Sequence, residues 1–448
     1  MKKYILIILC CLTSFPLWSY NVNMIVEHYS VDQGLPNNTV NCTLKDRDGF
    51  IWFGTWYGLC CFDGVKFKTF NKQEHDSDVP PRKIQRIVED KNGYIWVKTI
   101  DRKLYVFNKV TECFHAVYDD MKNYSENIQV IKLQNTAEGD VLLLTKDKNL
   151  LLAGVDEKGQ VTIKILFDSR NEINKHDYTL KHHVLCETEE YISWIGTDYK
   201  VAAVHKGSEL ASRPADFITS KINSGDKDSF TSFFEDGRKV WVGDRAGIFY
   251  SIDVRTGLVN RYVLSEIKGA ISNLLVTPAG YVYLSVAGQG TYEYDLAERR
   301  LQKINTEMND AMVTHAFIDQ YDKIWFHENE KALIYYDPLN HTAKRFPFTM
   351  FGKITTLYSE DAGERGLFFL SPAGEAWLFD REHAEMVYIN KLKQLSNDRA
   401  NQQFYHLMLD NDGVLWLSSA DEGVYCMNFP KKQFNLLSLS PQSAGQEN

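Results

Sequence analysis

Short apolar stretches alternate with polar turns along almost the whole chain. One such region begins with Ile84–Val88, turns at Asp90–Gly93, and continues with Tyr94–Val97, Leu104–Phe107 and Cys113–Val117. Short apolar runs bounded by Asp, Asn and Gly are typical of β-strands, because these polar residues favour turn conformations. The region is therefore predicted to form four short strands. The recurrence of its pattern predicts an all-β fold.

The same four-strand pattern recurs about every 45 residues, and each copy centres on a large apolar residue. In every copy about twelve residues separate this anchor from a polar residue that closes the next strand. The nine stretches are Trp52–Asp63, Trp96–Asn108, Leu144–Asp156, Trp194–Lys206, Trp241–Asp253, Tyr283–Asp295, Trp325–Asp337, Phe368–Asp380 and Trp416–Asn428. A repeated four-stranded unit of this length is typical of β-propeller blades. The anchor residues are then expected to pack between adjacent blades.

Composition narrows the possible functions. The 448 residues are 44% hydrophobic, 24% charged and 13% aromatic, which is an ordinary globular composition. The formal net charge is −9. Binding to nucleic acid relies on Lys and Arg that neutralise phosphates, and this chain has no basic run, so a DNA or RNA partner is not expected.

The first residues have the pattern of a secretory leader. Lys2 and Lys3 precede the apolar stretch 5–15, and Ser19 offers a small residue for cleavage. The apolar stretch is too short to cross a bilayer, so residues 1–19 are predicted to be a signal peptide and the chain is predicted to be exported. Beyond it, no apolar stretch reaches the length of about 18 residues that a membrane span requires.

The first copy carries a family resemblance. It contains the segments Tyr29–Val40, Asp46–Thr55, Gly58–Leu59 and Phe62–Gly64. This pattern closely resembles the two-component regulator propeller repeat of the exported N-terminal half of hybrid two-component sensors in Bacteroidetes-type bacteria. The resemblance extends over essentially the whole mature chain, although Leu144, Tyr283 and Phe368 replace the tryptophan in three copies.

The resemblance implies a domain arrangement. In that family two seven-bladed propellers precede a β-sandwich, a membrane helix and a histidine kinase core. We therefore expect a seven-bladed propeller over residues 20–346, two further blades over 347–435, and a linker or the start of a further repeat over 436–448. A single eight- or nine-bladed ring is the alternative. The end of the sequence at Asn448 after nine copies favours a piece of a longer sensor.

The resemblance also implies a function. The chain is expected to be a periplasmic, non-catalytic sensing module that binds oligosaccharides or polysaccharide breakdown products. It would signal as a homodimer to a kinase part that this sequence does not contain, and it would reach the inner membrane only through missing C-terminal segments. The alternative is a stand-alone secreted propeller enzyme or lectin that acts on polysaccharide.

Candidate ligand-binding residues follow from the order of the strands. The turn after each anchor strand should share a face of the propeller with the connections between blades, and loops on a rigid scaffold are common binding sites. The residues expected to bind ligand on these turns are Trp56, Tyr57, Asp101, Arg102, Asp198, Tyr199, Asp244 and Arg245. Two adjacent aromatic residues in a tight turn suit stacking on a sugar ring, although a blade edge or a domain interface would also explain them.

Motifs for catalysis and cofactors give no positive signal. The chain has no nucleophile elbow, zinc-binding helix motif or phosphate-binding glycine loop. Asp46–Gly49 and Asp410–Gly413 resemble calcium loops only faintly, since they lack the later ligands and the closing Glu, and Asp-Gly turns are what a hairpin requires. No catalytic residue, metal or cofactor is therefore predicted.

Overall fold

The computed structural model describes most of the predicted blades. The described residues are 25–70, 80–124, 129–169, 180–196, 201–207, 230–304, 313–328, 331–348, 358–363, 366–371, 376–389 and 404–428. Four predictions lie outside them: the signal peptide at 1–19, the candidate residues Asp198 and Tyr199, and the segment 436–448. Among the described residues, no helix has both the length and the apolar character needed to span a membrane.

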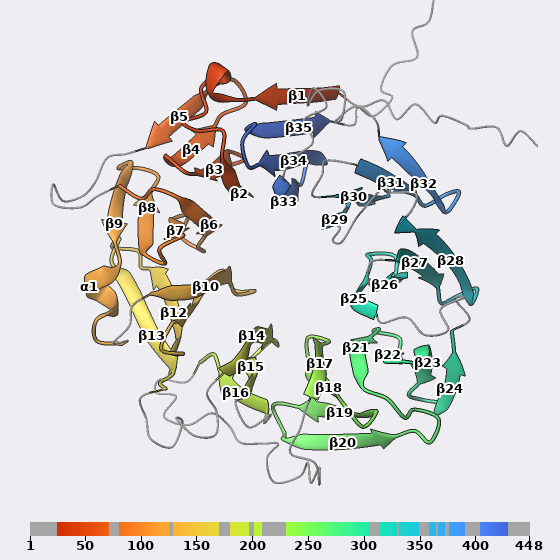
Figure 1. Ribbon diagram of the computed structural model, residues 1–448. Coiled ribbons are helices and arrows are strands. Elements are labelled where there is room, and N and C mark those ends of the chain that lie inside the picture. The colour runs from red at the N-terminus through yellow and green to blue at the C-terminus, as the bar shows by residue number, and fades with distance from the viewer. Residues whose placement is uncertain are drawn as a thin grey trace, which may run out of the picture.

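The described strands form nine antiparallel sheets, which Figure 1 shows around a circle with the first strand of each repeat toward the centre. From the centre outward, the first three sheets are β2 (Val40–Lys45), β3 (Ile51–Thr55), β4 (Gly58–Phe62) and β5 (Phe67–Phe70); β6 (Ile84–Glu89), β7 (Ile95–Thr99), β8 (Leu104–Asn108) and β9 (Cys113–Ala116); and β10 (Val130–Asn135), β11 (Val141–Thr145), β12 (Leu150–Val155) and β13 (Val161–Phe167). The next three are β14 (Leu180–Glu187), β15 (Tyr191–Gly196) and β16 (Val201–His205); β17 (Phe230–Glu235), β18 (Lys239–Asp244), β19 (Ile248–Asp253) and β20 (Leu258–Val263); and β21 (Ile271–Val276), β22 (Tyr281–Val286), β23 (Gly290–Asp295) and β24 (Arg300–Lys303).

The last three sheets complete the circle. They are β25 (Val313–Ile318), β26 (Ile324–Glu328), β27 (Ala332–Asp337) and β28 (Thr342–Pro347); β29 (Tyr358–Asp361), β30 (Leu367–Leu370), β31 (Ala376–Asp380) and β32 (Glu385–Ile389); and β33 (Phe404–Leu409), β34 (Val414–Ser419), β35 (Val424–Asn428) and β1 (Ile25–Tyr29). A short 3-10 helix, η1 (Val31–Gln33), follows β1, and α1 (Tyr118–Met121) follows β9. The predicted all-β propeller of four-stranded blades is confirmed, and every anchor residue lies in the second strand of its sheet.

Ring closure joins the two ends of the described chain. Strand β1 pairs antiparallel with β35, so that Glu27 lies opposite Cys426 and the first strand completes the last sheet. This is the single-ring alternative of the fold expected from the sequence. The boundary expected after residue 346 falls at the end of β28, which the sheet β29–β32 follows.

A buried hydrogen bond explains why the sequence repeats as it does. In the turn between β6 and β7, Asp90 Oδ1 accepts hydrogen bonds from the backbone N–H groups of Asn92 and Tyr94, at 3.0 Å each. Its other oxygen accepts a hydrogen bond from Trp96 Nε1 at 2.9 Å. The same carboxylate–indole bond joins Asp46 to Trp52, Asp236 to Trp241, Asp319 to Trp325 and Asp410 to Trp416. One aspartate therefore fixes both the turn and the ring orientation of the anchor.

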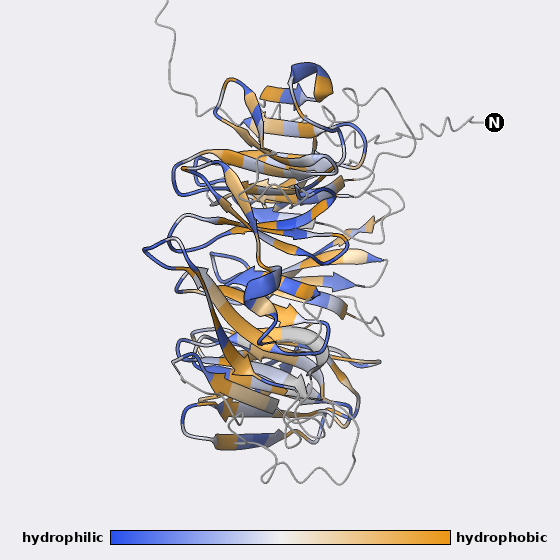
Figure 2. Ribbon diagram, turned by 90° about the vertical axis from the view of Figure 1, so that its left-hand side faces the viewer, coloured by the Kyte–Doolittle hydropathy of each residue, from blue (hydrophilic) through white to orange (hydrophobic). Residues whose placement is uncertain are grey.

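The anchor rings fill the seams between blades, as the sequence predicted. Trp96 packs with Val130 and Leu143 of the following sheet, and Trp416 packs with Phe53 and Phe62 of the first sheet. Figure 2 shows the result from the side: apolar residues gather along the strands, whereas the turns at the two faces are mostly hydrophilic. The turns are thus free to vary while the seams hold the ring together.

Removing the Asp90 carboxylate is expected to destabilise the ring by about 2–4 kcal/mol, because two backbone N–H groups and a buried indole N–H lose their acceptor. Asp63→Ala is the matched control, since Asp63 accepts from two backbone N–H groups in an exposed turn and no indole bond is formed there. Denaturant unfolding of Asp90→Ala and Asp63→Ala would measure the difference. Equal losses in the two variants would contradict the role given to the indole bond.

Ring closure predicts a specific cross-link. In Glu27→Cys the new thiol faces the native thiol of Cys426 on the paired strand, and the two form a disulfide on mild oxidation. Mass spectrometry of the digested protein would detect the linked peptides. Val26→Cys is the control because Val26 lies opposite Met427. An unlinked Glu27→Cys protein would favour a ring that closes elsewhere, such as the seven-bladed ring with two further blades.

Candidate functional site

One face of the ring, here called the loop face, carries the turns after the anchor strands and the connections between blades. A chain of backbone hydrogen bonds joins these segments across the first two blades. Lys83 N donates to Trp56 O at 2.9 Å, Ile100 N donates to Lys83 O at 2.9 Å, and Val130 N donates to Arg102 O at 2.9 Å. The turn of each blade is therefore held directly against the connection to the next blade.

Trp56 and Tyr57 are the most prominent side chains of the first turn. They form the two-residue connection between β3 and β4, where Thr55 Oγ1 accepts from Tyr57 N and donates to Gly58 O. Trp56 is 42% exposed and Tyr57 is 64% exposed. The Lys83 ammonium lies over the Trp56 ring, 5.4 Å from its centroid. The structure thus places both predicted aromatic residues on the surface and a cation beside one of them.

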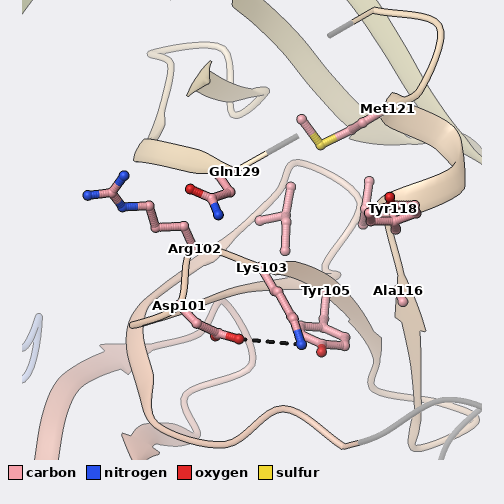
Figure 3. A pocket seen from close by; sticks show the side chains of 10 residues that line it. Asp101, Arg102, Lys103, Tyr105, Ala116, Tyr118, Met121 and Gln129 are labelled. Atoms are coloured by element: carbon pink, nitrogen blue, oxygen red, sulfur yellow. Dashed lines mark ion pairs between the residues drawn. The ribbon is translucent and has the colours of Figure 1, made fainter. Parts of the chain in front are cut away.

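A pocket of about 410 Å³ opens beside the next turn, as Figure 3 shows. Arg102 and Gln129 lie on one side of it and the exposed ring of Tyr118 on the other, and Tyr105 and Met121 also contribute to its wall. Arg102 has a left-handed backbone with φ 68°, which costs about 1 kcal/mol for a residue other than Gly. The turn therefore uses a strained conformation to hold this guanidinium at the pocket.

On β7, opposite the pocket residue Leu104, lies a lysine that the sequence analysis missed. Lys98 is only 7% exposed, and its ammonium donates to Gln85 Oε1 at 2.7 Å. Gln85 is available for this bond because the register of β6 shifts between Ile84 and Arg86 and leaves Gln85 outside the pairing. Burial, followed by the positive charges of Arg102 and Arg86, lowers the pKa of Lys98. Cross-strand register and a bulge create this arrangement, and neither is visible as a motif.

The other predicted residues lie elsewhere or serve the fold. Asp101 is exposed and its carboxylate accepts from Thr99 Oγ1 at 2.5 Å and pairs with Lys103 at 3.4 Å. Asp244 and Arg245 belong to the turn after β18, across the ring from Trp56. The Asp244 carboxylate accepts from the N–H groups of Ala246 and Ile248 within its own turn, while Arg245 is exposed. The structure brings together Trp56, Tyr57, Asp101 and Arg102 from adjacent blades, but not Asp244 and Arg245.

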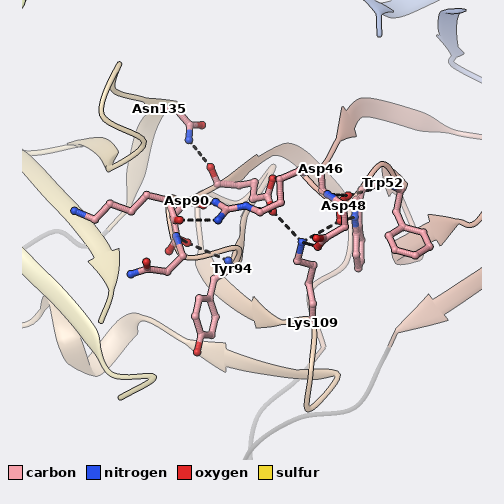
Figure 4. A network of polar contacts seen from close by, with 12 residues as sticks. Asp46, Asp48, Trp52, Asp90, Tyr94, Lys109 and Asn135 are labelled. Carbon is pink, nitrogen blue, oxygen red and sulfur yellow. Dashed lines mark hydrogen bonds and ion pairs between the residues drawn. The ribbon is translucent and has the colours of Figure 1, made fainter. Parts of the chain in front are cut away.

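Lysine side chains bind the carboxylates of the two acidic turns that faintly resemble calcium loops. Oxygen atoms of Asp46, Asp48 and Glu89 lie within 4.8 Å of one another, but Lys109 Nζ donates to all three at 2.7–3.0 Å (Figure 4). Burial lowers the pKa of Lys109, but the hydrogen bonds to the three carboxylates outweigh that effect and raise it. At the second such turn, Lys45 pairs with Asp410 and Asp412. A lysine thus occupies the position that a metal ion would need.

A second cavity, of about 730 Å³, runs along the innermost strands β17, β21 and β25. Its wall includes Phe230, Phe233 and His315, and Ser232 Oγ is buried there without a hydrogen-bond partner among the described residues. Burial lowers the pKa of His315. No predicted site residue lines this part of the central wall.

Comparisons with known proteins agree with the repeat. The family model described as "Two component regulator propeller" matches residues 34–57, which include β2, β3 and the Trp56–Tyr57 turn. No curated protein matches the chain.

Several solved structures are similar to the chain at low identity. The extracellular domain of the putative one component system BT4673 from B. thetaiotaomicron is 14% identical, with 88% of this chain and 65% of that chain covered and a TM-score of 0.37. The extracellular domain of the putative hybrid two component system BT3049 from the same organism is 14% identical, with coverages of 92% and 61% and a TM-score of 0.36. BamB from Moraxella catarrhalis is 13% identical, with coverages of 92% and 99% and a TM-score of 0.41.

The chain thus spans somewhat less than two thirds of the two sensor domains that it resembles. The family match falls on the copy whose residues first indicated the resemblance. Residues 34–57 therefore match the two-component regulator propeller repeat, which confirms the resemblance seen in the first copy of the sequence repeat.

Proposed function

We propose that the chain is the periplasmic ligand-sensing module of a hybrid two-component sensor and that it binds an oligosaccharide on the loop face. The observation that carries the proposal is the exposed Trp56–Tyr57 pair, which lies within the matched regulator propeller repeat. The ligand would be a breakdown product of a polysaccharide. Signalling would pass through a homodimer to a kinase part outside this sequence, and the membrane would be reached through segments that follow it.

The surroundings of the aromatic pair support a sugar ligand. Exposed aromatic faces can stack on the apolar face of a pyranose ring, and donors nearby can bind its hydroxyl oxygens. The Lys83 ammonium lies over the Trp56 ring. The adjacent pocket of about 410 Å³ is lined by Arg102, Gln129 and the Tyr118 ring. That volume falls within the range of small-molecule sites. Stacking rings and hydrogen-bond donors on adjacent blades can together hold several sugar units.

The pairing of the Asp101 carboxylate in the pocket favours a binding module over a propeller enzyme. Asp101 is the acidic residue among those that line the pocket, and it is paired with Lys103 and Thr99. Hydrolysis of a glycosidic bond usually needs two carboxylates that flank the bond. The proposal therefore assigns binding to this chain and catalysis to the kinase part.

The test is a pair of aromatic substitutions on opposite faces of one blade. A glycan array with residues 20–448 would first identify a ligand, whose binding is then measured by calorimetry. Trp56→Ala is expected to weaken binding at least about tenfold through loss of the stacking surface, without a change in melting temperature. Phe50→Ala is the control, since Phe50 is 41% exposed in the turn at the other end of β3.

Three results would contradict the proposal. Equal binding by Trp56→Ala and the unaltered protein would remove the aromatic pair from the site. The absence of any hit on the array would argue against a glycan ligand altogether. Cleavage of the ligand during incubation, detected by mass spectrometry, would favour the secreted enzyme.

A further inference from the structure

Three cationic side chains meet on the second blade without an acidic partner. Arg86 on β6 lies opposite Lys98 on β7 in the strand register, and Arg102 follows in the turn after β7. We call these three residues the cation cluster. Among the described residues, no carboxylate forms an ion pair with any of them, although the chain as a whole has a net charge of −9. The nearest acidic side chain in the turn, Asp101, pairs with Lys103 instead.

The buried position of Lys98 makes this imbalance informative. A buried ammonium usually has an acidic partner, because removing an unpaired charge from water is unfavourable. Lys98 has one neutral acceptor, Gln85, for its three N–H donors, and the positive charges of Arg86 and Arg102 act on it. Elsewhere in the ring the comparable cations are neutralised: Lys109 binds three carboxylates and Arg381 binds two. The cluster therefore differs from the structural ion pairs of this protein.

The cluster also extends toward the centre of the ring. The positive charge of Arg86 contributes to the lowered pKa of His406 on β33 and opposes the raised pKa of the Cys42 thiol on β2, although burial is the larger cause in both. Strand β2 of the first blade contacts both β6, which carries Arg86, and β33 of the last blade. Arg102, at the other end of the cluster, lines the pocket beside Tyr118. A ligand that follows the loop face inward would meet both guanidinium groups.

We propose that the ligand of the loop face is an acidic oligosaccharide, whose carboxylate or sulfate groups are held by the cation cluster of Arg86, Lys98 and Arg102. This inference rests on the proposed function and specifies the class of sugar. The two guanidinium groups donate hydrogen bonds to the anionic groups, and Lys98 strengthens the positive potential from behind. Arginine suits this role because its planar donors match both carboxylate and sulfate oxygens.

The test compares three tetrasaccharides of equal length by calorimetry at low salt: a galacturonic acid tetramer, a sulfated chondroitin tetrasaccharide and a neutral galactose tetramer. We expect an acidic probe to bind more tightly than the neutral one and to weaken as salt rises. Arg86→Gln and Arg102→Gln are each expected to weaken that binding about tenfold. Arg300→Gln, an exposed change on the outer strand β24, is the control. Tighter binding of the galacturonic acid tetramer would indicate that the cluster recognises carboxylates, and tighter binding of the sulfated probe would indicate sulfates.

A second measurement detects an anion at the cation cluster without relying on affinity. An anion at Arg86 offsets the positive charge that acts on His406, so saturation with the acidic probe should raise the His406 pKa, observed by NMR titration of the imidazole. Binding of the neutral tetramer as tightly as the acidic probes, or acidic-probe binding that is unchanged in both arginine variants, would overturn the acidic ligand and leave the proposed function standing. Failure of all three probes to bind would also overturn the acidic ligand. The proposed function has its own test, because only a glycan array without any bound glycan would contradict it.

Discussion

The hydrogen bond between a turn aspartate and the anchor tryptophan, which forms in five of the nine described sheets, is the constraint on which these blades depend. A buried carboxylate is unfavourable unless its oxygens are bonded, and here each oxygen has a defined task. In the turn at Asp90, one oxygen closes the turn and the other orients Trp96, which then fills the seam with the next blade. In several blades a cation from a neighbouring blade joins the same oxygen: Lys109 at Asp46 and Arg381 at Asp319. One side chain thus fixes both the turn and the ring that fills the seam.

This division of labour explains where variation is tolerated. The aspartate turns lie at one end of the anchor strands, and the loop face lies at the other end, where the repeat imposes no tryptophan–carboxylate bond. The turns there differ from blade to blade. The first has the exposed pair Trp56 and Tyr57, and the second has Arg102 with a left-handed backbone. In the fifth, the Asp244 carboxylate accepts a backbone hydrogen bond within its own turn. A rigid scaffold with unconstrained turns on one face is what binding requires, because the turns can change without loss of the core.

Local patterns predicted the strands, the anchors and the face that carries the variable turns, because strand and turn signals lie within a few residues of each other. They did not predict which strand closes the ring. The pairing of β1 with β35 joins segments about 400 residues apart, and a short stretch such as Ile25–Tyr29 does not encode its distant partner. For the same reason the cluster of Arg86 and Lys98 was missed, because it depends on a bulge in β6.

The position of the cation cluster links the candidate site to ring closure. Arg86 acts on groups in β33 and β2, so its field crosses the seam between the last blade and the first, and the outer edge of that last blade is formed by β1. Mutual repulsion among Arg86, Lys98 and Arg102 opposes close packing at this point of the ring. An anion that neutralises them removes the repulsion, and the binding energy of that anion is then added to the stability of the blades that meet there. The residues proposed to select the ligand would thereby be the ones through which its presence acts on the contact between the last blade and the first.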